Sequence, residues 1–310
     1  MDRYSNLLKY YSDRQFNPVP IVLGKKGQWE SHLAKRVNLL QNHLCIPVNL
    51  LKDKEALEIG CNSGENALVL AHYGAQLTLS EPNKHVHPLL FKNFESFSLN
   101  KQLKEVYSLG IEELITDNKF DLVIAEGFLN TMPKRNELLN KLCKLCKDEG
   151  LLIINYDDKY GGYFELIKSY VLKCICNINN INFRSKDSLE LAYTLYKDNF
   201  SNLNNSRSFE AWWEDQLVNP FAACLWSLEE ILQISEQSNF EFYSSSPMLP
   251  NPKLFKWYKD VGDSNEINQS IIDAWYESFI YILTGIKVEM NNCSTPNKNL
   301  IQTLDKHTSK

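Results

Sequence analysis

The chain has 310 residues, of which 44% are hydrophobic and 23% charged, and its formal net charge at pH 7 is −5. These values are ordinary for a globular protein, and the length fits one elaborated domain with a sizeable insertion. The negative charge and the absence of long Lys or Arg runs disfavour a nucleic-acid backbone as the main ligand, because proteins that bind one usually carry a basic face.

The chain contains no apolar run of the roughly 20 residues needed to span a bilayer and no apolar core typical of a secretory signal. We therefore expect a cytoplasmic protein without a membrane partner, whose eight cysteines are reduced. Two close pairs, Cys143 with Cys146 and Cys174 with Cys176, have the number of thiolates that a zinc site uses. Since the first pair falls in an amphipathic helical run, we expect buried thiols and no metal site.

The beginning of the chain, residues 1–50, is interpreted as a helical lid or cap. Amphipathic stretches at 4–13 and 29–44 predict two helices, and Pro18 and Pro20 separate them.

Residues 51–156 alternate short apolar strands with helices, a pattern typical of a parallel sheet with right-handed crossovers. The predicted strands are 56–59, 76–80, 104–108, 120–125 and 150–155. The predicted helices between them are 66–73, 88–96 and 136–147. We therefore expect an α/β fold with a doubly wound, mostly parallel sheet.

After residue 156 the alternation stops. Residues 157–226 are interpreted as a helical insertion that forms a substrate lid, with helical stretches at 162–174 and 209–217 beside a polar, asparagine-rich region. Ser227 and Glu230 have the spacing of a capping box, which predicts the start of another helix. Residues 227–290 are expected to supply a sixth strand at 240–243 and an amphipathic helix at 267–282, and 291–310 a mobile tail.

The segment 56–66 is predicted to be a strand, a turn with Gly60 and Gly64, and the start of a helix. In doubly wound sheets, ligands lie beyond the carboxyl ends of the strands, and this first turn usually contacts them. The glycines remove Cβ atoms where a ligand must approach the backbone. Asn62 stands between them, and asparagine tolerates a left-handed conformation better than most residues.

Two acids suggest which ligand the turn binds. Glu81 lies 21 residues after Gly60, where a carboxylate can accept hydrogen bonds from both ribose hydroxyls of a nucleoside. Glu58 would repel a pyrophosphate but suits S-adenosylmethionine (SAM), which has no phosphate and carries an ammonium and a sulfonium. The alternatives are a strand-end acid satisfied by helix amides for Glu58 and a solvated loop carboxylate for Glu81.

Several segments together resemble successive motifs of the class I SAM-dependent methyltransferases, a Rossmann-like superfamily. They are 56–83, 109–114, 120–129 and 149–154, and the likeness returns at 226–242. The resemblance implies a SAM-binding core at 51–156 and SAM as the cofactor.

By position, the resemblance also implies roles for single residues. Those that would hold the methionyl part of SAM are Glu58, Gly60, Asn62 and Gly64. Those that would hold the ribose are Glu81 and the next two loop residues, Pro82 and Asn83. Gly110 and Ile111 would flank the adenine. Glu126 and Gly127 would line the floor of the site after the fourth strand.

The sequence departs from the family pattern at two of these positions. Glycine is commoner where Asn62 stands. The family often has an aspartate for the adenine amino group where this chain has Gly110, so adenine recognition falls to backbone groups or to Glu112.

Methyl transfer from a sulfonium is an in-line displacement, so the enzyme mainly aligns the reactants and excludes water. The topology places Asn130, Tyr156 and Asp157 above the fourth and fifth strands, beside the expected acceptor. Asp157 is our candidate for a base or an orienting group, and its alternative is a solvated turn acid. The only histidine after His87 is His307, so a histidine base from the acceptor-binding half is not expected. Aromatic residues outside the sheet are candidate pocket walls, among them Tyr11, Trp212 and Trp213.

The chain lacks the Asp/Asn-Pro-Pro-aromatic signature of enzymes that methylate nucleic-acid amino groups, and it lacks the Pro-Cys pattern of carbon-5 pyrimidine methylation. We therefore expect a small-molecule acceptor with an O, N or S nucleophile. The alternatives are an RNA or protein methyltransferase, or a non-catalytic SAM-binding partner or regulatory domain. As for oligomeric state, we expect a monomer or a homodimer.

Overall fold

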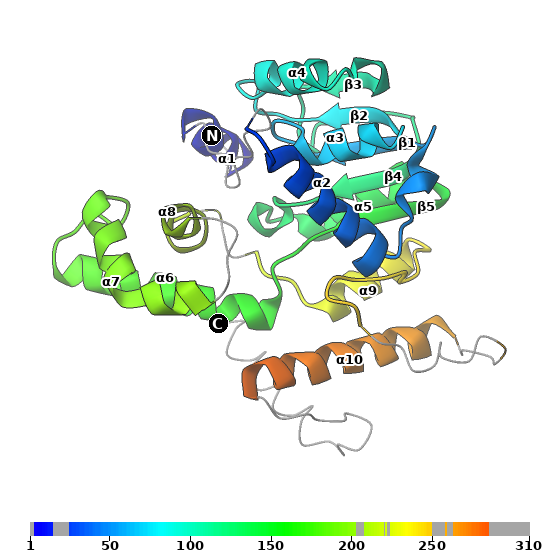
Figure 1. The fold of residues 1–310 in the computed structure, drawn as a ribbon. Coiled ribbons are helices and arrows are strands. Elements are labelled where there is room, and N and C mark those ends of the chain that lie inside the picture. Colours follow the sequence, from blue (N-terminus) through cyan, green and yellow to red (C-terminus); the bar gives the residue numbers. More distant parts are fainter. Residues whose placement is uncertain are drawn as a thin grey trace.

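The computed structural model describes residues 3–14, 25–202, 208–219, 221, 224–249, 258 and 263–284. A five-stranded sheet forms the centre, with the order β3-β2-β1-β4-β5 and all neighbouring strands parallel (Figure 1). The strands are β1 (Glu55–Ile59), β2 (Gln76–Ser80), β3 (Leu103–Tyr107), β4 (Phe120–Ala125) and β5 (Cys146–Ile154). The predicted α/β fold is confirmed, and the strand order reverses between β1 and β4, where such sheets bind their ligands.

Helices cover both faces of the sheet because successive strand residues point to opposite sides. Leu57, Val123 and their alternate neighbours pack against α5 (Arg135–Leu145) and α9 (Leu228–Gln237). Ala56, Leu122 and Ile124 lie in the cluster on the other face, which is covered by the remaining helices of the core. These are α2 (Gln28–Asn38), its π-helical continuation η1 (Leu39–His43), α3 (Glu65–His72) and α4 (His87–Ser96).

Three short 3-10 helices, η2 (Val48–Leu51), η3 (Asn100–Gln102) and η4 (Leu129–Thr131), connect elements of the core. At the beginning of the described chain, α1 (Arg3–Arg14) adds Leu7 to the cluster on the α5 face. Near its end, α10 (Ser264–Thr284) packs outside α9 through Ile271. No helix in the described part of the chain is both long and apolar enough to cross a bilayer.

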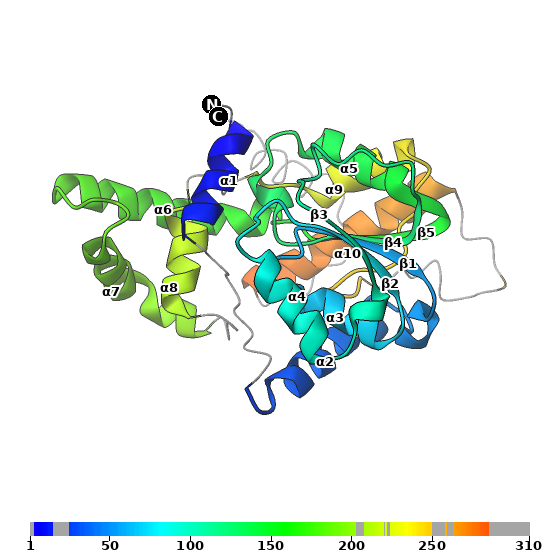
Figure 2. The same cartoon turned by 90° about the horizontal axis from the view of Figure 1, so that it is seen from above.

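The helices that lie between β5 and α9 in the sequence project away from the sheet (Figure 2), and we call them the helical arm. It consists of α6 (Lys159–Ile178), α7 (Lys186–Asn202), α8 (Phe209–Trp212) and the π-helical η5 (Trp213–Leu217). The arm has its own apolar cluster, in which Trp212 and Trp213 are buried. The chain then returns to the core where Trp226 forms a β-bridge with Asp158.

Several predicted boundaries differ from the structure. The helix predicted at 136–147 ends at Leu145, and Cys146 already begins β5. The helix α7 was not predicted. The capping box is confirmed, because Ser227 accepts from the Glu230 amide at 3.2 Å and Glu230 accepts from the Ser227 amide at 3.0 Å.

The sixth strand predicted at 240–243 is wrong, since these residues form no sheet ladder. Phe240 and Phe242 alternate because they pack with the helices on that side of the sheet. The Tyr243 and Ser244 hydroxyls donate to carbonyls of Cys45 and Leu44, which ties the segment to the core by side chains instead.

The burial predicted for the two cysteine pairs is found for Cys143, Cys146 and Cys176, whereas Cys174 is half-buried. Every cysteine that the structure describes is a free thiol, and both Cys143 and Cys146 are buried. Among the described residues, no group of three or more His, Cys, Asp and Glu side chains is arranged to hold a metal ion. The predicted tail at 291–310 lies outside the described residues.

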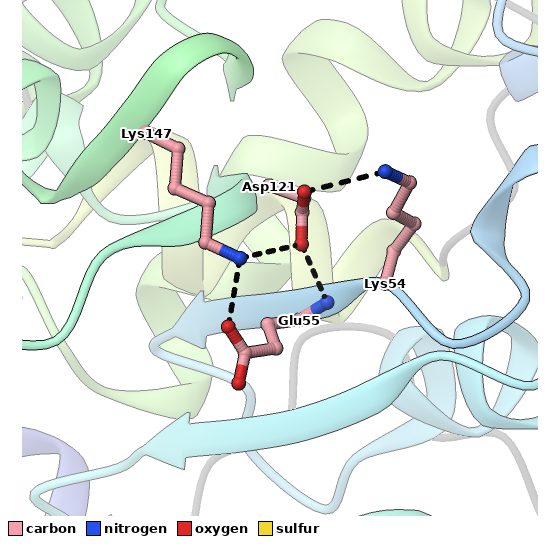
Figure 3. Close-up of polar contacts among 4 residues, drawn as sticks. All are labelled: Lys54, Glu55, Asp121 and Lys147. Atoms are coloured by element: carbon pink, nitrogen blue, oxygen red, sulfur yellow. Dashed lines mark hydrogen bonds and ion pairs between the residues drawn. The ribbon is translucent and has the colours of Figure 1, made fainter.

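An ionic network joins the amino-terminal ends of β1 and β4 on the surface (Figure 3). Lys147 lies 2.8 Å from Glu55 and 3.0 Å from Asp121, and the other Asp121 oxygen lies 3.4 Å from Lys54. The Glu55 amide also donates to Asp121 at 2.9 Å. The network therefore stabilises the amino-terminal ends of these strands. The candidate site lies at the opposite, carboxyl ends.

Candidate functional site

A cavity of about 570 Å³ lies at the carboxyl ends of β1, β2, β4 and β5. Every predicted cofactor residue except Gly64 lines it, namely Glu58, Gly60, Asn62, Glu81, Pro82, Asn83, Gly110, Ile111, Glu126 and Gly127. Of the predicted catalytic residues, Asn130 and Asp157 line this cavity. Tyr156 instead lines two neighbouring cavities. The sequence-based set is thus largely brought together in one place.

The turn after β1 has the left-handed backbone that its residues predict. Gly60 has φ +70°, and a Cβ atom there would lie 2.9 Å from the Phe128 ring. Asn62 has φ +50°. Gly64 has φ +82°, and a Cβ atom there would lie 3.3 Å from the Phe94 ring, so its missing side chain lets α4 approach the turn. Gly60 therefore belongs to the cavity wall, whereas Gly64 belongs to the packing behind it.

Glu81 joins the loop after β2 to the turn after β1. Its two oxygens accept the amides of Asn62 and Asn83, each at 2.8 Å. Burial raises the pKa of Glu81, and these two amide hydrogen bonds oppose that rise. Each carboxylate oxygen has a second lone pair, so Glu81 can also accept hydrogen bonds from a diol in the cavity.

Glu58 is a buried carboxyl with an unsatisfied oxygen. Its side chain is 4% exposed, and Oε2 has no hydrogen-bond partner among the described residues. Burial raises the pKa of Glu58 to about 8, while the Arg36 charge opposes the rise. A buried acceptor without a donor costs free energy, so the group fits a ligand that brings a positive charge or an N–H.

Arg36 was not predicted as a site residue. It lies on the buried face of α2, and its guanidinium binds both oxygens of Glu126, with Nη1–Oε1 at 3.1 Å and Nη2–Oε2 at 2.6 Å. Among the described residues that line the cavity, Arg36 is the only Lys or Arg. The sequence signal that could have identified it is a cation on the apolar side of an amphipathic helix.

The far end of the cavity is built by α1, η4, the end of β5 and η5, and we call it the acceptor chamber. Asn130 donates from Nδ2 to Asp157 Oδ2 at 2.6 Å. Gln216 donates from Nε2 to Asp215 Oδ2 at 2.9 Å. The apolar wall comes from Leu7, Leu8 and Met132.

The aromatic candidates divide between the chamber and other places. Tyr11 lines the cavity, and its hydroxyl accepts from Asn219 at 3.2 Å. Burial and the Asp215 charge raise the pKa of Tyr11. Trp212 and Trp213 lie in the core of the helical arm and do not line the cavity, so the expectation that this pair contacts substrate is not supported. Burial, with the Asp158 charge, also raises the pKa of Tyr156.

Comparison with known protein families identifies the family to which the chain belongs. Residues 32–245 match a family model described as a methyltransferase domain. Because the match spans more than half of the sequence, the chain belongs to this family of methyltransferase domains.

Individual relatives match only in part. A tRNA U34 carboxymethyltransferase of Aliivibrio salmonicida (strain LFI1238) is 32% identical over 79 residues, which are 26% of this chain and 24% of the relative. The match thus spans about a quarter of the length of that curated relative.

Two solved structures resemble the fold. PKMT2 from Rickettsia typhi has a TM-score of 0.48 and 18% identity, covering 67% of this chain and 41% of its own. Magnesium protoporphyrin IX methyltransferase (ChlM) from Synechocystis PCC 6803, with bound SAM, has a TM-score of 0.41 and 16% identity, covering 51% of this chain and 78% of its own. These values describe a partial likeness of fold.

Proposed function

We propose that the protein transfers a methyl group from SAM to a small-molecule acceptor, at an O, N or S nucleophile. The supporting observation is that one cavity is lined both by the strand ends and by residues of α1 and η5. Its volume of about 570 Å³ falls in the range of small-molecule sites. When bound, SAM supplies an electrophilic methyl group on a sulfonium. The protein aligns the acceptor with it and excludes water.

The residues present fit SAM at the strand ends. The unsatisfied Glu58 oxygen would meet the methionyl ammonium, and the Arg36 Nε–H, the one guanidinium group without a partner among the described residues, would meet the carboxylate. Glu81 would accept the ribose hydroxyls. The missing Cβ of Gly60 makes room for the Phe128 ring, and both residues belong to the cavity wall beside the expected methionyl part.

The remaining predicted cofactor residues complete the cofactor end of the cavity. Asn62, Pro82 and Asn83 would surround the methionyl and ribose parts. Gly110 and Ile111 would flank the adenine. Glu126 and Gly127 would form the floor, with Glu126 held by Arg36.

The acceptor would lie in the acceptor chamber. Asp157 would orient it or take its proton, and Asn130 would position Asp157 through their 2.6 Å hydrogen bond. Tyr156 would support the wall behind Asp157. The helical arm and α1 would act as a lid. A polyanionic acceptor is disfavoured, because Arg36, the one Lys or Arg in the described cavity wall, is already paired with Glu126.

The cofactor contacts are tested by calorimetric titration with SAM and with its demethylated product. Glu81→Ala is expected to weaken binding by about a hundredfold, because hydrogen bonds to a charged group contribute roughly 1.5–3 kcal/mol each. Glu95→Ala, an exposed glutamate on α4, is the matched control and should bind like the wild type. Equal binding by Glu81→Ala and wild type would remove Glu81 from the site.

The acceptor class is tested with SAM carrying a labelled methyl group and a cell extract divided into small-molecule, RNA and protein fractions. We expect label in the small-molecule fraction. Label in the nuclease-sensitive or protease-sensitive fraction would instead support an RNA or protein methyltransferase. Tight SAM binding without transfer to any fraction would support a non-catalytic role.

A further inference from the structure

The acceptor chamber contains two carboxamide–carboxylate pairs from different parts of the chain. One is Asn130 of η4 with Asp157 after β5, and the other is Gln216 with Asp215 on η5. In both pairs the amide nitrogen donates to a carboxylate oxygen. All four residues line the same cavity.

The hydrogen bonds fix the orientation of each amide. An ionised carboxylate only accepts, so each amide must turn its NH2 group toward its carboxylate. This leaves the carboxamide oxygen for another partner. For Asn130 that oxygen is buried and has no donor among the described residues. An unpaired buried acceptor costs free energy, and an N–H or O–H from a ligand would recover that cost.

In the described cavity wall, Arg36 and His32 are the basic side chains, and both already have partners. Arg36 binds Glu126 through both terminal nitrogens. The His32 ring bonds to the Glu65 carbonyl at 3.1 Å, and burial lowers its pKa, which favours the neutral ring. The chamber therefore suits a ligand that donates hydrogen bonds and carries positive charge, and it disfavours a carboxylate or phosphate ligand.

We propose that the methyl acceptor is an aliphatic amine, bound as an ammonium group between Asp157, Asp215 and the Asn130 carboxamide oxygen. Its apolar body would rest on Leu7, Leu8 and Met132. The inference rests on the proposed function and narrows the O, N or S acceptor to nitrogen.

The proposed methyl transfer needs no group beyond those already named. The ammonium gives one proton to the Asp157 carboxylate, which frees the nitrogen lone pair. The N–C bond forms while the methyl carbon–sulfur bond breaks, and that electron pair stays on sulfur. The product leaves as a methylated ammonium, and Asp157 returns its proton to water.

The test is calorimetric titration of the full chain, saturated with demethylated SAM, using three probes that share a phenethyl group: phenethylamine, phenethyl alcohol and hydrocinnamate. We expect the amine to bind at least about tenfold more tightly than the alcohol, because hydrogen bonds to charged groups are the stronger ones. The carboxylate should bind most weakly. Equal or tighter binding of the alcohol or carboxylate would overturn the proposal.

Variants separate a charge contact from a structural role. Asp157→Asn and Asp215→Asn should each weaken the amine about tenfold and change the alcohol by less than about twofold. Asp117→Asn, an exposed loop residue outside the cavity, is the matched control. A loss that is equal for amine and alcohol would indicate a distorted chamber and contradict the proposal.

Two further measurements distinguish a failure of this inference from a failure of the proposed function on which it rests. Binding of demethylated SAM is measured first in every variant. If that binding is intact but the amine preference is absent, this inference fails and the methyltransferase site stands. If the amine binds but demethylated SAM does not, the proposed cofactor contacts fail instead. A lysine-containing peptide that binds more tightly than the free amine would keep the amine chemistry and move its source to a protein side chain.

Discussion

The two ends of the cavity are built in different ways. At the cofactor end, each contributing loop follows directly from a strand, so register in the sheet fixes its position. At the acceptor chamber, α1 meets the end of η5 through Tyr11 and Asn219, which are 208 residues apart. The first end is determined by local sequence and strand pairing, and the second by how the helices pack.

This difference has consequences for stability as well. The cofactor end rests on the sheet, whose two faces are covered by continuous apolar clusters. The chamber depends on η5, which belongs to the separate apolar cluster of the helical arm. Loss of packing in the arm should therefore weaken binding of the acceptor and leave binding of the cofactor unchanged.

Trp212→Ala is the substitution for which we expect the largest effect, and it tests whether the two ends of the cavity are independent. Removing a buried tryptophan typically costs about 3–5 kcal/mol of unfolding free energy. We expect hydrogen exchange to accelerate in the arm and methyl transfer to fall by more than about tenfold, while SAM affinity changes by less than about twofold. Tyr170→Ala, an aromatic on α6 that is 70% exposed, is the control and should leave all three unchanged. An equal loss of SAM affinity would mean that the two ends are not independent.

Glu58 allows the cofactor end to be tested through the pH dependence of the unfolding free energy. Its pKa is about 8 in the folded chain against an ordinary 4.5, so the folded state holds a proton that the unfolded state has lost between these values. The contribution of Glu58 to stability is therefore fully present below pH 4.5 and is lost as pH rises toward 8. The slope is at most about 1.4 kcal/mol per pH unit.

Urea unfolding at several pH values between these limits measures that slope. Glu58→Gln should flatten it, since glutamine does not titrate. The difference between wild type and variant isolates Glu58 from Glu65 and Glu81, whose pKa values burial raises as well. Identical slopes in the two proteins would show that Glu58 is not protonated in the folded chain.

The same contrast explains what the sequence could predict. The five strands and the turn after β1 were readable because apolar runs, glycines and strand-end acids are local signals. The Arg36–Glu126 pair joins residues 90 apart, and no local pattern states that α2 reaches the end of β4. The segment at 240–243 alternates like a strand because Phe240 and Phe242 pack with helices. The helix α7 has Leu189 and Ala192 at helical spacing, but the surrounding asparagines obscured that signal.

The smallest expected effect concerns the edge of the sheet opposite to the cavity. Asp121→Asn keeps an oxygen for the Glu55 amide but removes the charge that Lys54 and Lys147 share (Figure 3). Since these groups are partly exposed, we expect a loss of about 0.5–1 kcal/mol in unfolding free energy at low salt, and less at high salt. SAM affinity should not change, because the network lies at the other end of β1 and β4. Asp117→Asn is the control for an isolated surface carboxylate. A loss that persists in high salt would indicate that Asp121 acts through packing of the strands, and a parallel loss of SAM affinity would show that the two edges of the sheet are coupled.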